Sequence, residues 1–263
     1  MKKYLYIFKS EIMTNLQYVF DIIMGFIGYA VHIFIFLNLW EHIYSDPNEL
    51  INGYSMNQMI WYVIVTEILW TALKGRQLCN RIIKDVRTGN IAYNIIKPYD
   101  YVKYILAGHL GSTLLRFFLV TILGMFLGYM FLGSIPHLTL LSILGILLSC
   151  FFALVISILI TITIGLISFF IEDSTPIYWV YSKFILILGT LFPVEFFPYI
   201  LRPFIKYSPI FAVSSSPAKL FVGFNLENFI EIMIIQMIYI IVTYLLASYI
   251  YKKGVKKLNV NGG

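Results

Sequence analysis

The sequence predicts an all-α polytopic membrane protein with six transmembrane helices in one domain, residues 1–263. Of its 263 residues, 60% are hydrophobic and only 12% are charged, and the mean hydropathy is +0.84. Ordinary globular domains carry about a quarter charged residues, so no soluble fold can bury this much apolar surface. The apolar residues also fall in runs long enough to cross a bilayer as helices, which need roughly 20 residues each.

Residues 2–16 are predicted to form a helix that lies flat in the cytoplasmic headgroup layer of the membrane. The segment begins with Lys2, Lys3 and Lys9, and its apolar side chains share one helical face: Tyr4, Leu5, Phe8, Ile12 and Leu16. A basic amphipathic helix of this kind binds at the lipid–water interface. A frayed polar tail is the alternative.

The transmembrane helices are expected where the apolar runs lie, near 19–40, 56–73, 104–132, 137–170, 177–191 and 228–251. The fourth run exceeds the roughly 20 residues that a bilayer requires, and it ends at Glu172-Asp173-Ser174-Thr175-Pro176. Because no proline interrupts it and its two glycines are isolated, we expect one long or tilted helix. Two short spans are the alternative, but they would place the Lys-rich tail on the opposite side of the membrane.

The basic residues predict that both termini face the cytoplasm. Short loops rich in Lys and Arg stay on the cytoplasmic side of a membrane. Of the 19 Lys and Arg residues, 14 fall in the N-terminal segment, in residues 74–103 and in the tail after residue 251. The loop at 41–55 has three acidic residues and no Lys or Arg, as expected for an external loop.

Residues 74–103, between the second and third spans, carry seven positive charges against two negative ones. Within this segment the apolar residues recur at helical spacing, and charged residues occupy the other face. The apolar set is Leu78, Cys79, Ile82, Ile83 and Val86. Gly89 is expected to end the helix, and Pro98 keeps it from continuing into the next span. We predict a short amphipathic helix at 76–88 that docks a soluble partner.

The outer segment at 192–224 contains five of the nine prolines and many Phe and Tyr residues. It is too apolar for a free loop and too rich in proline for one straight helix. Short broken helices that re-enter the outer leaflet satisfy both constraints if their irregular backbone faces protein or a cavity. Such breaks often mark a substrate path or gate. The alternative is a structural cap that only packs the ends of the bundle.

Ionisable side chains inside spans are costly and are usually paired or functional. Glu67 and Lys183 lie at equal depth near the cytoplasmic ends of the second and fifth predicted spans. They are therefore candidates for an ion pair that lines an inner path. The alternative is that each snorkels or meets other partners, and Arg116 is a rival for Glu67. We expect Arg116 to snorkel to the cytoplasmic interface. Glu195, between two prolines of the outer segment, is expected to cap a broken helix or, alternatively, to gate an exit.

The remaining polar and small residues of the spans have structural interpretations. His32 and His109 are lone and far apart in sequence, which favours satisfied polar packing over a ligand role. Gly124 and Gly128 form a Gly-x-x-x-Gly pattern. We expect close helix packing within the subunit there, rather than a dimer contact.

The sequence lacks the motifs of an enzyme. It contains no Gly-x-x-x-x-Gly-Lys-Ser/Thr phosphate loop, no His-Glu-x-x-His and no Gly-x-Ser-x-Gly, so it is not expected to hydrolyse nucleotide by itself. The two cysteines have no zinc-site spacing, and we expect no metal or cofactor bound by this chain. Nucleic-acid binding is not expected either, because the positive residues cluster at membrane boundaries rather than on one soluble face.

Two stretches resemble the permease subunit of ABC-2-type bacterial exporters, in particular the small six-helix permeases without a fused ATPase. Residues 88–100, from Thr88-Gly89-Asn90 to Lys97-Pro98-Tyr99-Asp100, are similar to the family's Gly-x-(few apolar)-(Lys/Arg)-Pro segment after the cytoplasmic docking helix. Residues Phe192-Pro193-Val194-Glu195-Phe196-Phe197-Pro198-Tyr199, with the later Ser216-Pro217-Ala218, are similar to its Phe-Pro-x-(acid)-x-x-Pro segment and the small-residue-Pro step that follows.

The resemblance implies a transporter of the bacterial cytoplasmic membrane. Two permeases, of the same chain or of a paralogue, would pair around a central path, and separate ATPase subunits would bind ATP and Mg beneath them. Closure of the ATPases would move the docking helix and shift spans one, two and five. The cargo would be amphipathic or lipid-like, such as a drug, an antimicrobial peptide or a lipid, exported from the cytoplasm. The alternative is a non-transporting regulatory or anchoring subunit of a membrane ATPase or sensor complex.

These interpretations give two sets of candidate site residues. The expected contacts with the ATPase are Arg76, Arg81, Ile82, Lys84, Asp85, Val86, Asn90, Pro98 and Tyr99. The expected path or gate residues are Glu67, Lys183, Phe192, Pro193, Glu195 and Phe196.

Overall fold

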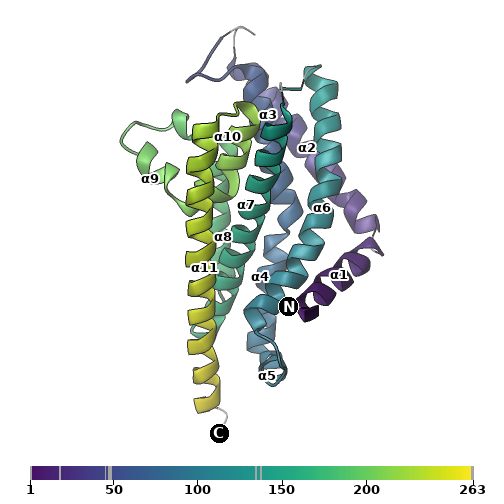
Figure 1. Cartoon of the computed structure of the whole chain (residues 1–263), viewed down its shortest axis with the longest axis vertical. Helices are drawn as coiled ribbons and strands as arrows, with labels where there is room; N and C mark the ends of the chain where they lie inside the picture. The colour runs from purple at the N-terminus through teal and green to yellow at the C-terminus, as the bar shows by residue number, and fades with distance from the viewer. Residues whose placement is uncertain are drawn as a thin grey trace.

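The computed structural model shows a long helical bundle (Figure 1) and describes residues 2–17, 19–44, 46, 49–133, 135–136 and 138–261. The side chains of residues 19–23 and 258–261 are outside this description. Also outside it are three positions of the acidic loop predicted at 41–55 and the first position of the span predicted at 137–170. The described residues form helices and no strand, which confirms the all-α prediction.

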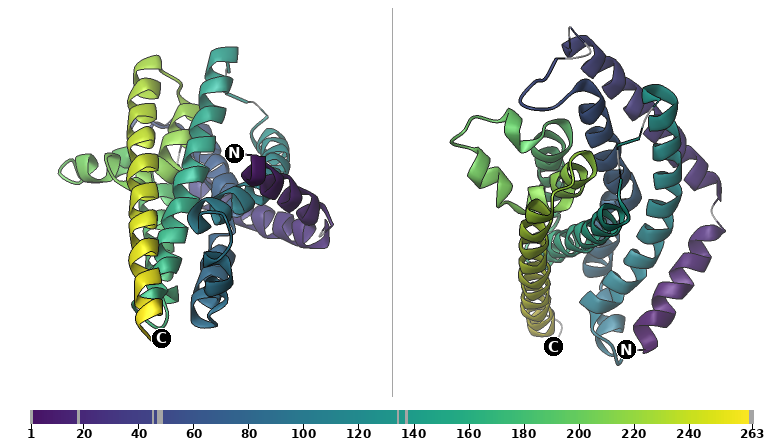
Figure 2. Two further views of the ribbon diagram at one scale, coloured as in Figure 1. Left: turned by 60° about the horizontal axis from the view of Figure 1, so that its bottom comes forward. Right: turned by 45° about the horizontal axis from the view of Figure 1, so that its top comes forward.

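The chain begins with α1 (Lys2–Leu16), which lies on the flank of the bundle beside α6, as both views of Figure 2 show. No residue of α1 is buried. Its backbone nevertheless approaches α6 closely, because a Cβ added at Gly111 would lie 2.5 Å from the Phe8 carbonyl oxygen. The predicted helix at 2–16 is therefore present and is held against the bundle.

The next two long helices are α2 (Val19–Ile43) and α3 (Met56–Leu73). A capping box starts α3: the Ser55 hydroxyl accepts from the backbone amide of Gln58, whose side chain accepts from the Ser55 amide. Residues 59–69 of α3 are buried without a break. A helix that is buried on all sides lies at the centre of a fold, so α3 is the central helix of the bundle.

The basic segment after α3 folds into two short helices. The longer, α4 (Gly75–Arg87), buries all five apolar residues predicted for its inner face. Thr88 is its C-cap, and Gly89 follows with a left-handed φ of +73°, as the sequence predicted. The shorter, α5 (Asn90–Ile95), precedes the loop that contains Pro98. Asp100 then caps α6 (Tyr101–Leu132) by accepting from the Lys103 amide at 2.8 Å.

The fourth apolar run forms one continuous helix, α7 (Leu140–Leu166), extended by the 3-10 turn η1 (Ile167–Phe169). The prediction of one long helix is confirmed. Packing of α6 on α2 and α3 requires Gly124 and Gly128, since a Cβ would lie 2.5 Å from the Tyr29 hydroxyl of α2 at Gly124 and 2.4 Å from the Trp61 ring of α3 at Gly128. The predicted packing within the subunit is therefore confirmed.

The proline-rich part of the chain is broken into short helices, as predicted. The segment predicted at 192–224 comprises η3 (Val194–Phe196), α9 (Arg202–Lys206), the π-helix η4 (Phe211–Ser215) and α10 (Ser216–Val222). The fifth predicted span, at 177–191, comprises α8 (Thr175–Ile185) and the π-helix η2 (Leu186–Leu191). Figure 1 shows α9 projecting from the side of the bundle.

The last helix, α11 (Leu226–Asn261), runs along α7 and continues through the Lys-rich tail, ten residues past the predicted end at 251. The extension is stabilised by packing, because Gly254 is buried against the Phe169 ring and Val255 joins the same apolar cluster. The tail lysines at 252, 253, 256 and 257 lie on the exposed side.

Four helices of the described chain are long and apolar enough to cross a membrane: Met24–Ile43, Tyr101–Leu132, Leu140–Phe169 and Leu226–Lys257. The second and fifth predicted spans correspond to α3 and to α8 with η2, which fall outside this set. Polar residues such as Asn57, Gln58 and Glu67 lower the hydropathy of α3, and α8 has only 11 residues. Both lie among the long helices (Figure 1), and the six-span path stays a prediction.

The two ends of the bundle differ in composition. We call the end with α4, α5 and the C-terminus of α11 the basic end (Figure 1). We call the opposite end, where α2 ends and α3 begins and where η3 lies, the aromatic end, because Trp40, Tyr44, Tyr54, Phe192 and Phe196 pack together there.

Candidate functional site

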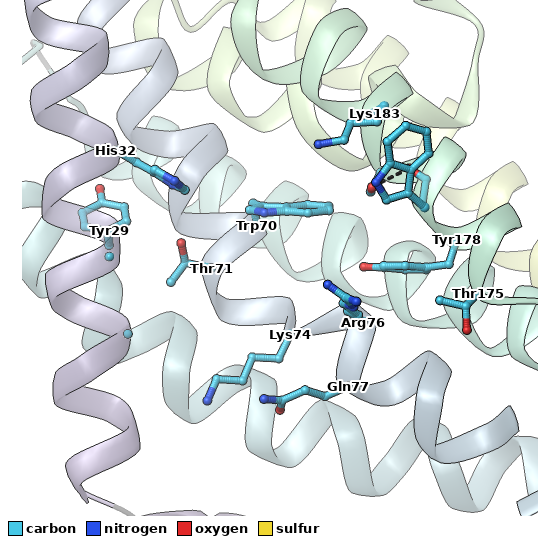
Figure 3. Close-up of a pocket in the computed structure, with 15 residues that line it drawn as sticks. Tyr29, His32, Trp70, Thr71, Lys74, Arg76, Gln77, Thr175, Tyr178 and Lys183 are labelled. Carbon is cyan, nitrogen blue, oxygen red and sulfur yellow. Dashed lines mark hydrogen bonds between the residues drawn. The ribbon is translucent and has the colours of Figure 1, made fainter. Parts of the chain in front are cut away.

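A groove runs along one side of the central helix, between α2, α3 and α8. It consists of a lower cavity of about 570 Å³ and an upper cavity of about 330 Å³, which share His32, Trp70, Ser182 and Lys183. The lower cavity opens at the basic end beside the first turn of α4, and the upper one reaches Thr190 of η2. Figure 3 shows the side chains around the lower cavity.

The one carboxylate among the described residues that line the groove belongs to Glu67, which is only 3% exposed. Its Oε2 lies 3.4 Å from Nδ1 of His32. Lys183 lines the same upper cavity, but its ammonium lies 5.6 Å from the ring centroid of Trp179 and forms no ion pair with Glu67. The predicted ion pair between Glu67 and Lys183 is therefore not formed in this conformation. His32, which was assigned to polar packing, is the partner of Glu67.

Two basic side chains approach the groove from different helices. Figure 3 shows Lys183 of α8 and Arg76 of α4 on opposite sides of the Trp70 ring, with Tyr178 beside Arg76. Lys74, Gln77 and Thr175 complete the mouth of the lower cavity. The groove is thus aromatic along its wall and basic at its mouth.

α4 is joined to the groove helices by a very short connection and by close packing. Only Lys74 separates α3 from α4, and it adopts a left-handed conformation with φ +45°. On the buried face, a Cβ at Gly75 would lie 2.4 Å from the Tyr178 hydroxyl, and one at Gly165 would lie 2.8 Å from Ile82. Displacement of α4 would therefore be transmitted directly to α3, α7 and α8.

Two side chains of α6 hold the end of α3 at this joint. The last four carbonyls of a helix have no partner within it. Here Arg116 Nε donates to the Ala72 carbonyl at 2.9 Å, and His109 Nε2 lies 2.7 Å from the Leu73 carbonyl. Arg116 also donates to Asn15 Oδ1 of α1 at 3.1 Å. The prediction that Arg116 snorkels is wrong: it is 7% exposed and bridges three helices. His109 has the packing role that was expected.

The predicted ATPase contacts separate into exposed and buried residues. On or near α4, five are exposed: Arg76, Arg81, Lys84, Asn90 and Pro98. Ile82 and Val86 are 0% and 7% exposed and pack into the chain's own core. They support α4 and cannot contact a partner, because the face of a helix that fills the core is not available to another protein.

The last two predicted contacts bind neighbouring residues. Asp85 accepts from the Tyr101 hydroxyl at 3.0 Å, which ties α4 to the start of α6. Tyr99 is half-buried and donates to Asn94 Oδ1 at 2.8 Å.

The chain around Asp173, which was predicted only as the end of an apolar run, lies beside α4. A concavity of about 560 Å³ is formed by Asn80, Ile83, Lys84, Arg87 and Thr88 together with Asp173, just before α8, and Thr175, the first residue of α8. The hydroxyl and amide of Thr175 hold the pKa of Asp173 below its usual value. The acidic pair at 172–173, at the end of an apolar run, was the available signal for this loop.

At the aromatic end, Glu195 joins three segments of the chain. Its carboxylate accepts from the Tyr54 hydroxyl at 3.0 Å and forms an ion pair with Lys219 of α10. Arg202 holds the same turn by donating to the carbonyls of Glu195 and Phe197 at 2.7 and 2.9 Å. Burial by itself would raise the pKa of Glu195, but Lys219 and Tyr54 hold that pKa below its ordinary value. The sequence predicted that this carboxylate caps a broken helix. In the structure it links separate segments of the chain instead.

The predicted gate residues gather just beyond the upper end of the groove. Thr190 lines the upper cavity, and the aromatic cluster starts two residues later. The Trp40 ring centroid lies 6.2 Å from that of Phe192 and 5.8 Å from that of Phe196, and Pro193, next to Phe192 in sequence, is buried. The structure therefore places Glu67 and Lys183 in the groove, and Phe192, Pro193, Glu195 and Phe196 where the groove is closed.

The comparisons with known proteins agree with this architecture. No curated protein matches the chain. The family model described as ABC-2 family transporter protein matches residues 9–262, which is nearly the whole sequence. The chain therefore belongs to the ABC-2 transporter family and is a multi-pass membrane component of an ABC transporter.

Proposed function

We propose that the chain is the permease subunit of an ATP-driven exporter that moves amphipathic or lipid-like cargo out of the bacterial cytoplasm. Separate ATPase subunits, which bind ATP and Mg, dock on α4, and a second permease completes the path. The observation that carries the proposal is the position of α4. Its charged face is exposed, its apolar face is buried, and its first turn forms the mouth of the groove.

In this proposal the basic end faces the cytoplasm. Its exposed basic residues come from α4 and from the end of α11, and positive charge is retained on the cytoplasmic side. An ATPase beneath the membrane would then meet Lys84 and Arg87 directly. Movement of α4 would change the width of the groove, because α4 is fixed to α3 and α8 at the single-residue joint and at Gly75.

The groove supports a transport role. One chain leaves it open on its side, and the rims carry exposed apolar residues such as Val31 and Phe34 on α2 and Val180 and Phe184 on α8. A second permease, identical or a paralogue, packed on these rims would enclose a central path. A purely regulatory or anchoring subunit would have no need of a groove of this size reaching the docking helix.

The proposed cycle starts from the conformation seen here, with the groove open at the basic end and closed at the aromatic end. ATP-driven closure of the ATPases would push α4 and shift α2, α3 and α8 until the aromatic end separates. Such a change is a shift between two packed arrangements, each stabilised by different contacts.

The docking step is tested by reversing charge on α4. Lys84→Glu with Arg87→Glu changes two exposed residues and leaves the buried face intact. Arg81 is left unchanged, because it lies 3.8 Å from Glu11 and helps to hold α1. When the chain is co-expressed with an ATPase encoded beside it in the genome, we expect the double variant to reach the membrane but to lose the ATPase during purification and to lose ATP-dependent export.

The matched control is Lys252→Glu with Lys253→Glu, the same change of charge on the exposed side of α11. It should retain the ATPase. If the α4 variant keeps the ATPase and exports at the wild-type rate, docking at α4 is wrong.

A further inference from the structure

The charge around the groove gives information about the cargo, provided that the chain is a permease as proposed. Among the described residues that line the lower cavity, Lys74, Arg76 and Lys183 are basic and none is acidic. In the upper cavity Glu67 is acidic, but His32 already lies at its carboxylate. The net charge of the groove is therefore positive.

Lys183 is the strongest element of this pattern because of its position. It lies nine residues into α8, not at the boundary of the helix, and lines both cavities. No carboxylate of the described residues lies within ion-pair distance of its ammonium, which instead lies over the Trp179 ring. A charge at this depth in a membrane protein is costly and usually serves a function.

Arg76 provides a second charge from a different helix. Figure 3 shows it beneath Trp70, with Lys183 above. A guanidinium donates several hydrogen bonds in a fixed fork that fits phosphate and carboxylate. The general enrichment of basic residues on the cytoplasmic side explains Arg76 by itself, but it does not explain a lysine inside the groove.

The walls between these charges are aromatic. Tyr29, Trp70, Tyr178 and Trp179 line the lower cavity, and Phe36 and Ile35 line the upper one. Such a surface accepts an apolar chain or ring. An anionic group and an apolar body can thus be bound together along the groove.

We propose that the cargo is an amphiphile with an anionic head group, such as a phosphate or carboxylate, bound between Lys183 and Arg76 with its apolar part along the Trp70 wall. The ammonium and guanidinium donate to the head group. Glu67, held by His32, lies at the upper end of the groove and disfavours deeper entry of the anion.

Three probes with the same chain length but different head groups test the assignment: dodecyl phosphate, dodecyl maltoside and dodecyltrimethylammonium, each below its micelle-forming concentration. The full-length permease is placed in phosphatidylcholine nanodiscs, and binding is followed by tryptophan fluorescence, since Trp70 and Trp179 line the groove. We expect dodecyl phosphate to bind at least tenfold more tightly than either of the others, because a hydrogen bond to a charged group is worth about a factor of ten or more in affinity. Inorganic phosphate alone is expected to bind far more weakly, which separates an amphiphile site from a free-anion site.

The charge variants locate the effect. Lys183→Gln and Arg76→Gln should each weaken binding of dodecyl phosphate about tenfold and leave binding of dodecyl maltoside within about twofold. Lys183→Glu should go further and favour the cationic probe. Lys252→Gln on the exposed side of α11 is the matched control and should change nothing.

The proposal is overturned if the cationic or neutral probe binds as tightly as the phosphate, if the glutamine variants leave phosphate binding unchanged, or if inorganic phosphate binds as well as the amphiphile. Co-purification of the ATPase is measured on the same preparations. A wild-type permease that binds the ATPase but shows no head-group selectivity contradicts only the anionic cargo. A permease that never binds an ATPase contradicts the proposed function.

Discussion

The two ends of the groove are built in opposite ways. At the basic end, Arg76 and Lys183 are exposed, and the ring of Trp179 is 60% exposed. At the aromatic end, Trp40 is 1% exposed, and Glu195 is bound by Tyr54 and Lys219. The basic end leaves its charged side chains accessible, whereas the polar and aromatic side chains of the aromatic end contact one another. Stability and ligand binding should therefore respond to substitution at different ends.

The largest difference is expected between two tryptophans. Trp40→Ala empties a buried site at the aromatic end and should lower the free energy of unfolding by about 3 kcal/mol or more. Trp179→Ala removes an exposed ring at the basic end and should change it by no more than about 0.5 kcal/mol. Thermal unfolding of both variants in the same nanodiscs measures the contrast. Equal losses of stability would mean that the two ends do not differ as described.

A smaller effect is expected from the ion pair at the aromatic end. Glu195→Ala removes the partner of Lys219 and of the Tyr54 hydroxyl, in a site where both charged side chains are less than a third exposed. We expect a loss of about 1–2 kcal/mol. Lys206, paired with Glu231 at 2.7 Å but more exposed, is the matched control, and Lys206→Ala should cost less than about 1 kcal/mol.

A double-mutant cycle separates the two contributions at this site. Glu195→Ala and Lys219→Ala should be non-additive if the pair is formed. Fully additive losses would show that Glu195 acts through Tyr54 alone, and the closed end would then depend less on charge than the structure indicates.

The same pair predicts a weak dependence of stability on pH. Because Lys219 and Tyr54 hold the pKa of Glu195 below its ordinary value, the contribution of Glu195 is present above that ordinary value and is lost as the pH falls through the lowered pKa. The difference in unfolding midpoint between wild type and Glu195→Gln should be constant from pH 7 to about 5 and should shrink below about pH 4. A difference that grows on acidification has the wrong sign and would contradict the ion pair.

Sequence periodicity predicted the elements well because each depends on local chemistry. The five inward residues of α4, the stop at Gly89 and the unbroken α7 follow from spacing, glycine and the lack of proline. Side-chain partners were harder, because they depend on how helices distant in sequence approach one another. Equal depth suggested Glu67 with Lys183, but the rotation of α2 brings His32 to Glu67 instead. Arg116 was assigned to the interface by its distance from the helix end, whereas the carbonyls at the end of α3 provide a partner that the linear pattern does not show.

The last prediction concerns labelling rates instead of stability. Single cysteine substitutions, one in the groove and one in the aromatic cluster, test whether the two ends open alternately. The native Cys79 and Cys150 are buried, and burial raises the pKa of the Cys79 thiol to about 12, so labelling of the wild type by a charged maleimide should be negligible. In the complex with the ATPase and without ATP, Ser182→Cys in the groove should be labelled and Phe192→Cys in the aromatic cluster should not. Trapping the ATPase with ATP should reverse the two labelling rates. Closure of the basic end should protect Ser182→Cys, and separation of the aromatic cluster should expose Phe192→Cys to water and to the maleimide. If Ser182→Cys is protected while Phe192→Cys also stays protected, α4 closes the groove without opening the aromatic end, and the movement proposed for α2, α3 and α8 is wrong.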